Sequence, residues 1–495
     1  MAEDDQLPSK RDCLQKKIGR LPVLLIETFQ NWGRTQNMTV ISVKPKTVED
    51  VTKIVKAMNE YNKEKHHNMI SLRCVGDGHS WSPLFPDDGN ILMYTSQLKR
   101  ADDRIKLDEP SDDLSHPLTV TIAPGVTTGE LSKFFTENNV CFKTDVILDK
   151  VTYGGVIAPG CHGVGKDQKA VSDYVKGMSI VRANGEETIY DFPTEKGADF
   201  DNALKCNMGL FGVMTGITME VQPMVIVEVV NDFSYTVEDL FYNQTKLEEL
   251  YDKNWSLEIF WFPFNSLSWS QVFLLNHLPR WVNWHPKQDT LWVRKINPVD
   301  VPSNSTPNQV EYDIKAVQDL ISIGFGRLVT PALKKSPKLI PSFLKAGFEM
   351  VQKSNKQIRH ETINKAIHYQ NFIEVMPVLD MEFAFNANKG TFAEQVKAIQ
   401  QVVQITENYF NKSEREFPLS VAMEMRWMAH SDCLICPAHA VHETEEKEKA
   451  TLYLEVLSLA GQENWKTYTE DIADKWMEMK INGKAPLPHW AKQWS

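Results

Sequence analysis

The sequence predicts an α+β fold with two large domains. Strand-like and helix-like segments alternate without an internal repeat, glycine-rich loops punctuate the first 225 residues, and 495 residues exceed what one hydrophobic core usually serves. The composition, 42% hydrophobic and 24% charged, is typical of an ordered globular protein. We expect an N-terminal segment at 1–33, a first α+β domain at 34–225, a second at 226–415 and a C-terminal segment at 416–495.

The first domain begins with a strand at 39–45 and a helix at 47–64, where an apolar stripe follows a capping threonine, Thr47. Further strands are expected at 69–76, 90–96, 118–125 and 210–224, a second capped helix at 127–140, and a hairpin with an Asn-Gly turn within 171–192. In the second domain, strands are expected at 226–237, 256–264, 371–386 and 418–429, with a helix at 391–410. Residues 285–360 show no strong period.

Charge and hydropathy exclude several classes of protein. A net charge of −11 argues against a nucleic-acid partner, and no run of about 18 apolar residues predicts a transmembrane helix. The charged N-terminus lacks a signal-peptide core, which favours the cytoplasm. Five sequons, at Asn37, Asn243, Asn254, Asn304 and Asn411, instead suit a secreted or lumenal glycoprotein whose leader has been removed. The two locations stay open. Seven scattered cysteines predict no disulfide framework.

Three glycine-rich loops lie in the first domain. The first is Gly76-Asp77-Gly78-His79-Ser80, the second spans 154–165, and the third spans 209–216. None of the three loops fits the Walker pattern or the dinucleotide fingerprint. Taken alone, each loop is as well explained by a tight turn as by a ligand site. Glycine lets backbone N–H groups approach phosphate oxygens closely. Three such loops in one domain therefore favour a ligand that contains a pyrophosphate.

These loops, with "EMRW" at 424–427 and "PHWAK" at 488–492, resemble the FAD-linked oxidases of the vanillyl-alcohol oxidase type. The closer resemblance is to their sugar-1,4-lactone and alditol oxidase branch. It implies a two-subdomain FAD-binding domain of the PCMH type and an α+β substrate cap. It also implies an FAD cofactor attached covalently through His79, and dehydrogenation of a CH–OH group with O2 reduced to H2O2.

The resemblance also implies the site residues. The residues implied to bind the cofactor are Gly76, Asp77, Gly78, His79, Ser80, Gly155, Gly160, Cys161, His162, Gly163, Gly212 and Ile217. Catalytic roles fall to Glu424, Arg426 and Lys492, and substrate contacts to His430 and Trp427. The period of two in a strand places Glu424 and Arg426 on one face, with Met423, Met425 and Trp427 on the other.

Several alternatives stay open. Relatives in this branch include oxidases of the aromatic cyanohydrin mandelonitrile, and the same fold serves dehydrogenases that pass electrons to another protein. A flavin-binding protein without turnover is a further alternative. The run Cys433-x2-Cys436-x2-His439-x2-His442 invites a zinc site or a local disulfide, but zinc pairs are normally about a dozen residues apart. We favour a loop that lines the active site.

Overall fold

The computed structural model describes residues 6–65, 69–100, 103–108, 117–300, 332–333, 335–354, 358–369, 377–388, 390–442 and 449–494. The sequon Asn304 and the first part of the strand expected at 371–386 lie outside these residues. The chain divides into two compact units. The first comprises 1–162, 170–224 and 432–436, and the second comprises 163–169, 225–431 and 437–495. None of the described helices is long and apolar enough to cross a lipid bilayer.

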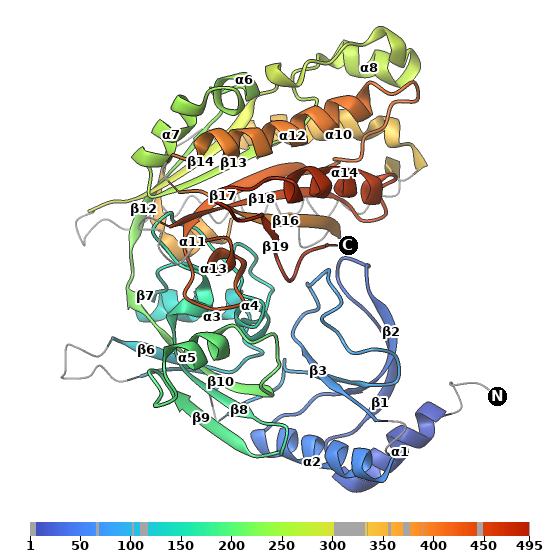
Figure 1. The fold of residues 1–495 in the computed structure, drawn as a ribbon, viewed down its shortest axis with the longest axis vertical. Helices are drawn as coiled ribbons and strands as arrows, with labels where there is room; N and C mark the ends of the chain where they lie inside the picture. The colour runs from blue at the N-terminus through green and yellow to red at the C-terminus, as the bar shows by residue number, and fades with distance from the viewer. Residues whose placement is uncertain are drawn as a thin grey trace. The chain divides into compact units, whose positions relative to one another are not determined.

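One lobe of the first unit is a four-stranded sheet beside two helices (Figure 1). The strand order is β1 (Leu25–Gln30), β2 (Asn37–Val43), β4 (Ile91–Tyr94) and β3 (Leu72–Val75), and the helices are α1 (Gln6–Ile18) and α2 (Val48–Glu64). The predicted cap of α2 is confirmed, because the Thr47 hydroxyl accepts from the Asp50 N–H and the Asp50 carboxylate accepts from the Thr47 N–H. The buried residues Val51, Ile54 and Val55 form the helix face that packs into this lobe.

The other lobe is an antiparallel five-stranded sheet. Its strand order is β5 (Ile105–Leu107), β6 (Thr119–Ile122), β10 (Val213–Glu220), β8 (Val175–Val181) and β9 (Glu187–Asp191). Its remaining elements are β7 (Val140–Cys141), β11 (Gln222–Pro223), α3 (Thr128–Asn138), α4 (Tyr153–Ile157), η2 (Val171–Tyr174) and α5 (Ala198–Lys205). The predicted hairpin is confirmed as β8–β9, with Gly185 at a φ of 77° in its turn.

The second unit is built on an eight-stranded antiparallel sheet. Its order is β15 (Arg359–Thr362), β12 (Ile226–Asp232), β14 (Leu291–Pro298), β13 (Ser256–Trp261), β17 (Ala422–Ala429), β18 (Ala450–Leu459), β16 (Val378–Asn386) and β19 (Leu487–Pro488). Its helices include α6 (Val237–Phe241), α7 (Gln244–Lys253), α8 (Trp269–His277), α10 (Ile340–Ser354), α12 (Phe392–Phe410) and α14 (Trp465–Met477). Further elements are α11 (Ile363–Ile367), α13 (Pro437–Ala440), η3 (Pro279–Trp281), η4 (Pro286–Gln288) and η5 (Pro337–Leu339).

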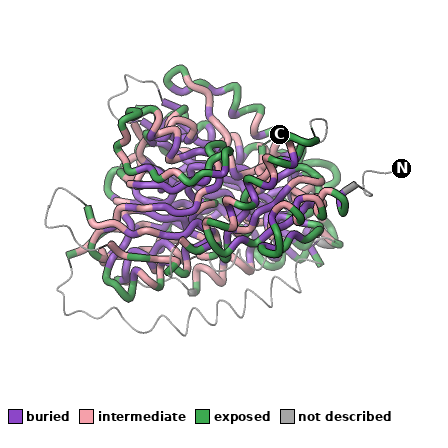
Figure 2. Tube along the Cα trace, turned by 90° about the horizontal axis from the view of Figure 1, so that it is seen from below, coloured by how far each residue is buried: buried purple, intermediate pink, exposed green. Residues whose placement is uncertain are grey.

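The two faces of this sheet differ in character. One face, with Met423, Met425 and Trp427 on β17, packs into the large hydrophobic core beneath helices that include α7 and α12 (Figure 1). The other face carries charged side chains on several strands, and these are buried as well. The tube coloured by burial shows that the buried stretches run through the interior of the molecule (Figure 2). Buried charge requires partners, and those partners make up the candidate site.

Three expectations for individual segments were wrong. The stretch 285–360 contains the strand β14 and the helix α10. The strand was hidden because β14 is buried on both faces, so its residues do not alternate between apolar and polar. Residues 171–174 form the 3₁₀ helix η2 ahead of β8. Gly216, expected in the third glycine loop, lies within β10.

Candidate active site

The loop that carries His79 is held by the turn between β1 and β2. The Trp32 N–H donates to the Gly78 carbonyl over 2.9 Å, and the Asn31 amide donates to the Ser80 carbonyl over 2.8 Å. The Trp32 indole stacks on the His79 ring, with centroids 4.8 Å apart and ring planes inclined by 17°. The Asp77 carboxylate lies 3.2 Å from His79 Nε2. The imidazole is therefore fixed in position while its other nitrogen, Nδ1, stays available.

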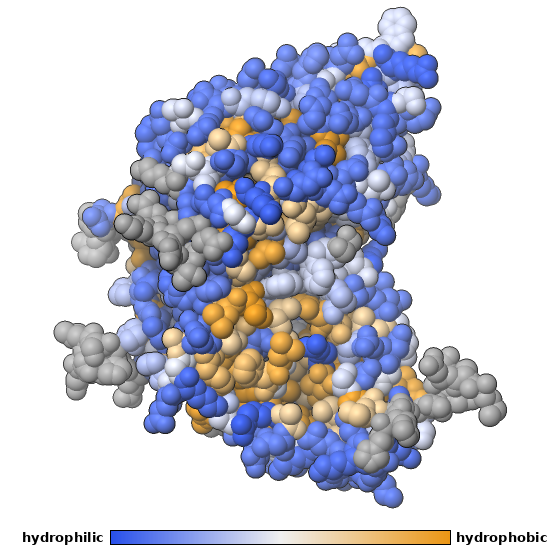
Figure 3. Space-filling view, in the orientation of Figure 1, coloured by the Kyte–Doolittle hydropathy of each residue, from blue (hydrophilic) through white to orange (hydrophobic). Residues whose placement is uncertain are grey.

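A cavity of about 320 Å³ lies in the first unit, and the glycine loops line it. Gly76, Asp77, Gly78, His79, Ser80, Gly155 and Gly212 are among its lining residues. Arg73 and Arg182 bring positive charge, and most of the remaining lining side chains are apolar. Figure 3 shows apolar side chains gathered on the surface of this unit. The lining thus offers glycine backbone, cationic groups and apolar surface in one place.

The close fit of the loops explains why glycine is needed. A Cβ on Gly76 would lie 1.9 Å from Thr152 Oγ1, and one on Gly212, where φ is +133°, would lie 2.3 Å from the Val181 carbonyl oxygen. Among the described residues, neither His79 Nδ1 nor Thr152 Oγ1 has a hydrogen-bond partner, although both atoms are buried. Both residues line the cavity. Unsatisfied buried polar atoms beside a glycine-walled cavity fit a polar ligand such as FAD.

The remaining cofactor candidates are not among the residues that line this cavity. Gly160, Cys161 and His162 follow α4, where His162 is only 6% exposed, and Gly163 is assigned to the second unit. Ile217 is fully buried in β10 and belongs to the core of the second lobe.

Glu424 and Arg426 form an ion pair on the charged face of the second unit. Arg426 Nε lies 3.1 Å from Glu424 Oε1, and their side chains are 10% and 4% exposed. On the neighbouring strand β18, Glu455 lies opposite Glu424, and Arg426 Nη2 donates to Glu455 Oε2 over 3.2 Å. Directly opposed residues of antiparallel strands share a face. Glu455 therefore belongs to the same cluster.

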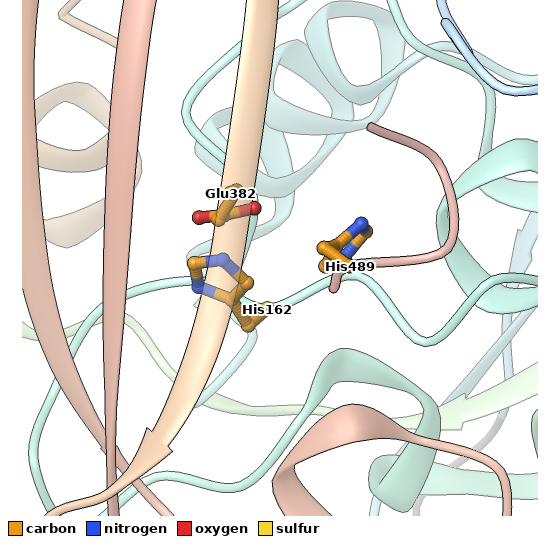
Figure 4. Close-up of side chains that lie close together, drawn as sticks. All are labelled: His162, Glu382 and His489. Atoms are coloured by element: carbon orange, nitrogen blue, oxygen red, sulfur yellow. The ribbon is translucent and has the colours of Figure 1, made fainter. Parts of the chain in front are cut away.

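Lys492 joins this cluster from the segment after β19. Its ammonium group donates to Glu455 Oε1 over 2.6 Å and to Asp380 Oδ2, and it lies 3.9 Å from Glu382 Oε2. Asp380 and Glu382 are two residues apart on β16, and the His489 N–H donates to the Glu382 carbonyl over 2.9 Å. Figure 4 shows Glu382 on its strand and His489 on the segment beside it. Glu455 thus bridges Lys492 and Arg426.

The cluster continues across β13 to β14. Glu258 lies opposite Arg426 on one side and opposite Arg294 on the other. Arg294 is fully buried, donates to Glu258 over 2.5 Å and to the Ala366 carbonyl, and its guanidinium carbon lies 3.7 Å from the centre of the Tyr369 ring. Opposite charges therefore face each other from β14 through β13 to β17, whereas Glu424, Glu455 and Glu382 lie directly opposite one another on β17, β18 and β16.

Charge balance determines which of these acids hold protons. Five carboxyl groups (Glu258, Asp380, Glu382, Glu424 and Glu455) face three cations (Arg294, Arg426 and Lys492), so full ionisation would leave a net charge of −2.

Burial raises the pKa of Glu424 to about 8 against the attraction of Arg426, and burial together with nearby Glu455 raises the pKa of Asp380 well above its ordinary value. Burial would raise the pKa of Glu455 too, but Lys492 and Arg426 outweigh it and lower that pKa. One proton on each of Glu424 and Asp380, the two acids whose pKa is raised, would offset the net charge of −2.

The two substrate candidates lie in different surroundings. Trp427 is 1% exposed on the helix-covered face, where its indole donates to Gln395 over 2.8 Å, so it does not share the face of Glu424. His430 follows β17, its Nδ1 lies 3.0 Å from the Ala438 carbonyl, and burial with His442 nearby lowers its pKa to about 4. His430 is therefore a neutral imidazole at pH 7.

The Cys–His run is divided between the two units. Cys433 and Cys436 belong to the first unit and are thiols in the structure, whereas His439 and His442 belong to the second. Burial raises the pKa of Cys433 and that of nearby Cys206 well above the ordinary value. These two thiols are therefore protonated and poor nucleophiles at neutral pH.

Five charged residues of the cluster escaped the sequence analysis: Glu258, Arg294, Asp380, Glu382 and Glu455. The sequence did contain a signal for them, because each of these charged residues interrupts a strand that is otherwise largely apolar. "DME" at 380–382 repeats the spacing of "EMR" at 424–426. Charged residues two apart in a buried strand indicate a shared polar face.

Comparison with known proteins agrees with this geometry. Residues 40–189 match the FAD binding domain family, and residues 268–495 match the D-arabinono-1,4-lactone oxidase family. Two solved cholesterol oxidases share the fold over 95% of this chain. One, described as solvent-stable, has a TM-score of 0.73 and 15% identity over 88% of its own chain. The other, from Brevibacterium sterolicum, has a TM-score of 0.72 and 16% identity over 87%. The protein thus has the FAD-binding fold of the PCMH type.

Within that class the chain is similar to sugar lactone oxidases, which confirms the resemblance found in its motifs. It is 24% identical to L-gulonolactone oxidase of Bos taurus over 236 residues, 48% of each chain. It is also 24% identical to D-arabinono-1,4-lactone oxidase of Candida glabrata over 241 residues, which cover 48% of this chain and 42% of the relative. The matched part spans about half the length of these curated relatives.

Proposed function

We propose that the protein is an FAD-dependent oxidase that dehydrogenates a CH–OH group of a sugar lactone, a polyol or a related hydroxy compound. The observation that carries this proposal is the buried Glu424–Arg426 pair, in the region that matches the lactone oxidase family. In the balanced reaction, one alcohol and one O2 give one carbonyl compound and one H2O2. Bound FAD would accept two electrons from the alcohol and pass them to O2.

In the corresponding domain assignment, residues 34–225 bind FAD, residues 226–415 form the substrate cap, and residues 416–495 supply catalytic groups.

The charged cluster suits the protein's share of this chemistry. The pKa of Glu424, about 8, lies close to neutral pH. At pH 7 a minor ionised fraction can accept the hydroxyl proton, and that fraction grows as pH rises towards 8, while the protonated form can donate a hydrogen bond to the substrate. Arg426 and Lys492 provide fixed positive charge for a developing anion, and Glu455 holds both in position. His430, neutral at pH 7, would donate or accept a hydrogen bond to substrate.

We assign the cavity of the first unit to FAD and His79 to its covalent attachment. The support for this assignment is the position of His79 on the cavity wall, fixed by Trp32 and Asp77, with Nδ1 buried and unsatisfied. Acid precipitation of purified protein should leave the yellow colour in the pellet, on the peptide that contains His79. In His79→Ala the flavin should be released by acid or absent, whereas His360→Ala, at an exposed histidine, should retain it. Release from the unmodified protein would refute the covalent link.

Substrate turnover tests the function itself. A panel of sugar lactones, polyols and mandelonitrile should include a compound that bleaches the flavin without air and yields one H2O2 per substrate in air. Glu424→Gln should abolish bleaching, whereas Glu394→Gln, at an exposed position on α12, should not. Bleaching without peroxide would identify a dehydrogenase with another electron acceptor. A yellow protein that no compound bleaches would contradict the proposal.

A further inference from the structure

The helix α8 and the turn η3 that follows it expose a row of aromatic side chains. Trp269, Phe273 and His277 lie four residues apart on α8, which places them on one side of the helix, and Trp281 follows in η3. The exposed fractions of Trp269, Phe273 and Trp281 are 50%, 62% and 80%. The rings of Phe273 and His277 are in contact, with centroids 4.5 Å apart.

The opposite side of α8 is anchored in the second unit. Val272 and Leu275 are 3% and 1% exposed and belong to its hydrophobic core. Leu274 and Leu278, 36% and 50% exposed, widen the aromatic row. The helix thus has apolar side chains on both sides, although one side faces solvent. Exposed aromatic and aliphatic side chains that are contiguous mark a site of interaction.

The charge around this row is positive, whereas the chain as a whole carries −11. No Asp or Glu occurs at 263–288 or at 332–348, and η5, which packs beside α8, belongs to the second of these stretches. Arg280, Lys335 and Lys338 are exposed there. Two further lysines have acidic neighbours, Lys287 beside Glu238 and Lys345 beside Glu349, so they do not contribute free positive charge.

We propose that this α8–η3 surface, comprising Trp269, Phe273, Leu274, Leu278, Arg280 and Trp281 with Lys335 and Lys338, docks the protein peripherally on an anionic lipid surface. Tryptophan has an apolar ring with a polar N–H and accumulates at the boundary between lipid and water. A helix with a basic rim and exposed Trp, Phe and Leu side chains lies in that boundary and is attracted by anionic headgroups.

The charge pattern disfavours a second copy of the chain as the occupant. A twofold dimer places the same patch of both subunits face to face. That arrangement would oppose Arg280, Lys335 and Lys338 of one copy to the same cations of the other, with no acidic residue at 263–288 or 332–348 to offset the repulsion. An anionic bilayer neutralises these cations and covers the aromatic row.

Sedimentation of the full-length holoprotein with lipid vesicles tests the proposal. The protein should bind vesicles of phosphatidylcholine with phosphatidylserine more tightly than vesicles of phosphatidylcholine alone, and salt should weaken the binding. Phe273→Ser with Trp281→Ser should weaken binding to the anionic vesicles at least tenfold. The matched control is Ile189→Ser, which removes a side chain of comparable exposure (58%) from β9 of the first unit and should bind unchanged.

A charge variant keeps the test independent of the aromatic residues. Arg280→Glu with Lys338→Glu should remove the preference for anionic vesicles while flavin content and the melting curve stay as in the parent protein. Equal binding of parent and aromatic variant, or no binding of the parent to anionic vesicles, would overturn the proposal. So would a change from dimer to monomer in the aromatic variant, because it would assign the surface to a second copy. None of these measurements depends on substrate turnover.

Discussion

Removing the two acids that contact Lys492 gives a sharp test of the charge balance in the second unit. Glu455 and Asp380 both accept from Lys492, and Glu455 also accepts from Arg426. We infer that Glu455 is ionised and that Asp380 holds a proton. Asp380→Asn then replaces a neutral acid with a neutral amide of the same shape. It should lower the free energy of unfolding by less than about 1 kcal/mol.

Glu455→Gln removes an ionised carboxylate, but the carboxyl group of Asp380 can take over its role beside Lys492. Without Glu455 the pKa of Asp380 should fall, because Glu455 helps to keep it high, and Asp380 can release its proton and compensate Lys492. We expect a cost of about 1–2 kcal/mol, below the cost of about 3–5 kcal/mol for an unpaired buried charge. In the double variant both acids that accept hydrogen bonds from Lys492 are gone and Glu382, whose Oε2 lies 3.9 Å from the ammonium group, is left beside it. The cost should approach about 3–5 kcal/mol, the range measured for broken buried ion pairs.

Urea unfolding at pH 7, followed by far-UV circular dichroism, measures all three variants. The double variant should lose more than the sum of the two single variants, because each single variant keeps one acid hydrogen-bonded to Lys492. Infrared spectra should show one protonated carboxyl fewer in Asp380→Asn. Glu394→Gln, at an exposed position, should match the parent protein. Additive losses, or an Asp380→Asn variant as unstable as the double variant, would refute the assignment of protons.

Three further predictions concern single residues. The pKa of Glu424 is raised to about 8 in the folded protein, above its value in the unfolded chain. Its contribution to the stability of the fold is therefore present at low pH and is lost as pH rises towards about 8. In urea titrations, the free energy of unfolding relative to Glu424→Gln should fall by about 1.4 kcal/mol per pH unit between pH 5 and 8. Gly76→Ala would place a Cβ 1.9 Å from Thr152 Oγ1 and should lower the flavin-to-protein absorbance ratio, whereas Gly347→Ala, with open space around it, should not. Thr47→Ala removes the cap of α2 and should cost about 1 kcal/mol in the same urea assay, and no loss would contradict the capping box.

Local sequence signals predicted the elements whose stability is local. The cap of α2 needs only Thr47 and Asp50, three residues apart, and the hairpin β8–β9 needs only its turn and two adjacent strands. The same holds for β17, where a period of two separates Glu424 and Arg426 from the core. In each case the groups that interact are neighbours in the sequence, so composition and spacing are sufficient.

The charged cluster could not be assembled from the sequence because its partners are distant. Asp380 and Lys492 are 112 residues apart, and Arg294 and Glu258 are 36 apart. Their contacts depend on the order and register of the strands, which the pattern of any one strand does not specify. The loop before β2 was missed for a similar reason. Trp32 and Asn31 hold a glycine loop more than forty residues further along the chain.

The neutrality of the cluster also bears on the substrate. Lys492 and Arg426 each have an acid of this chain within hydrogen-bond distance, so neither offers an uncompensated charge. A carboxylate or phosphate on the substrate would add a negative charge to a face where five acids already share three cations, and it would have to give up its hydration. We therefore expect an uncharged hydroxy compound to bind. In competition assays with the substrate, a lactone should inhibit, whereas its ring-opened carboxylate should not. Equal inhibition by the two forms would show that one of the cations is open to the substrate.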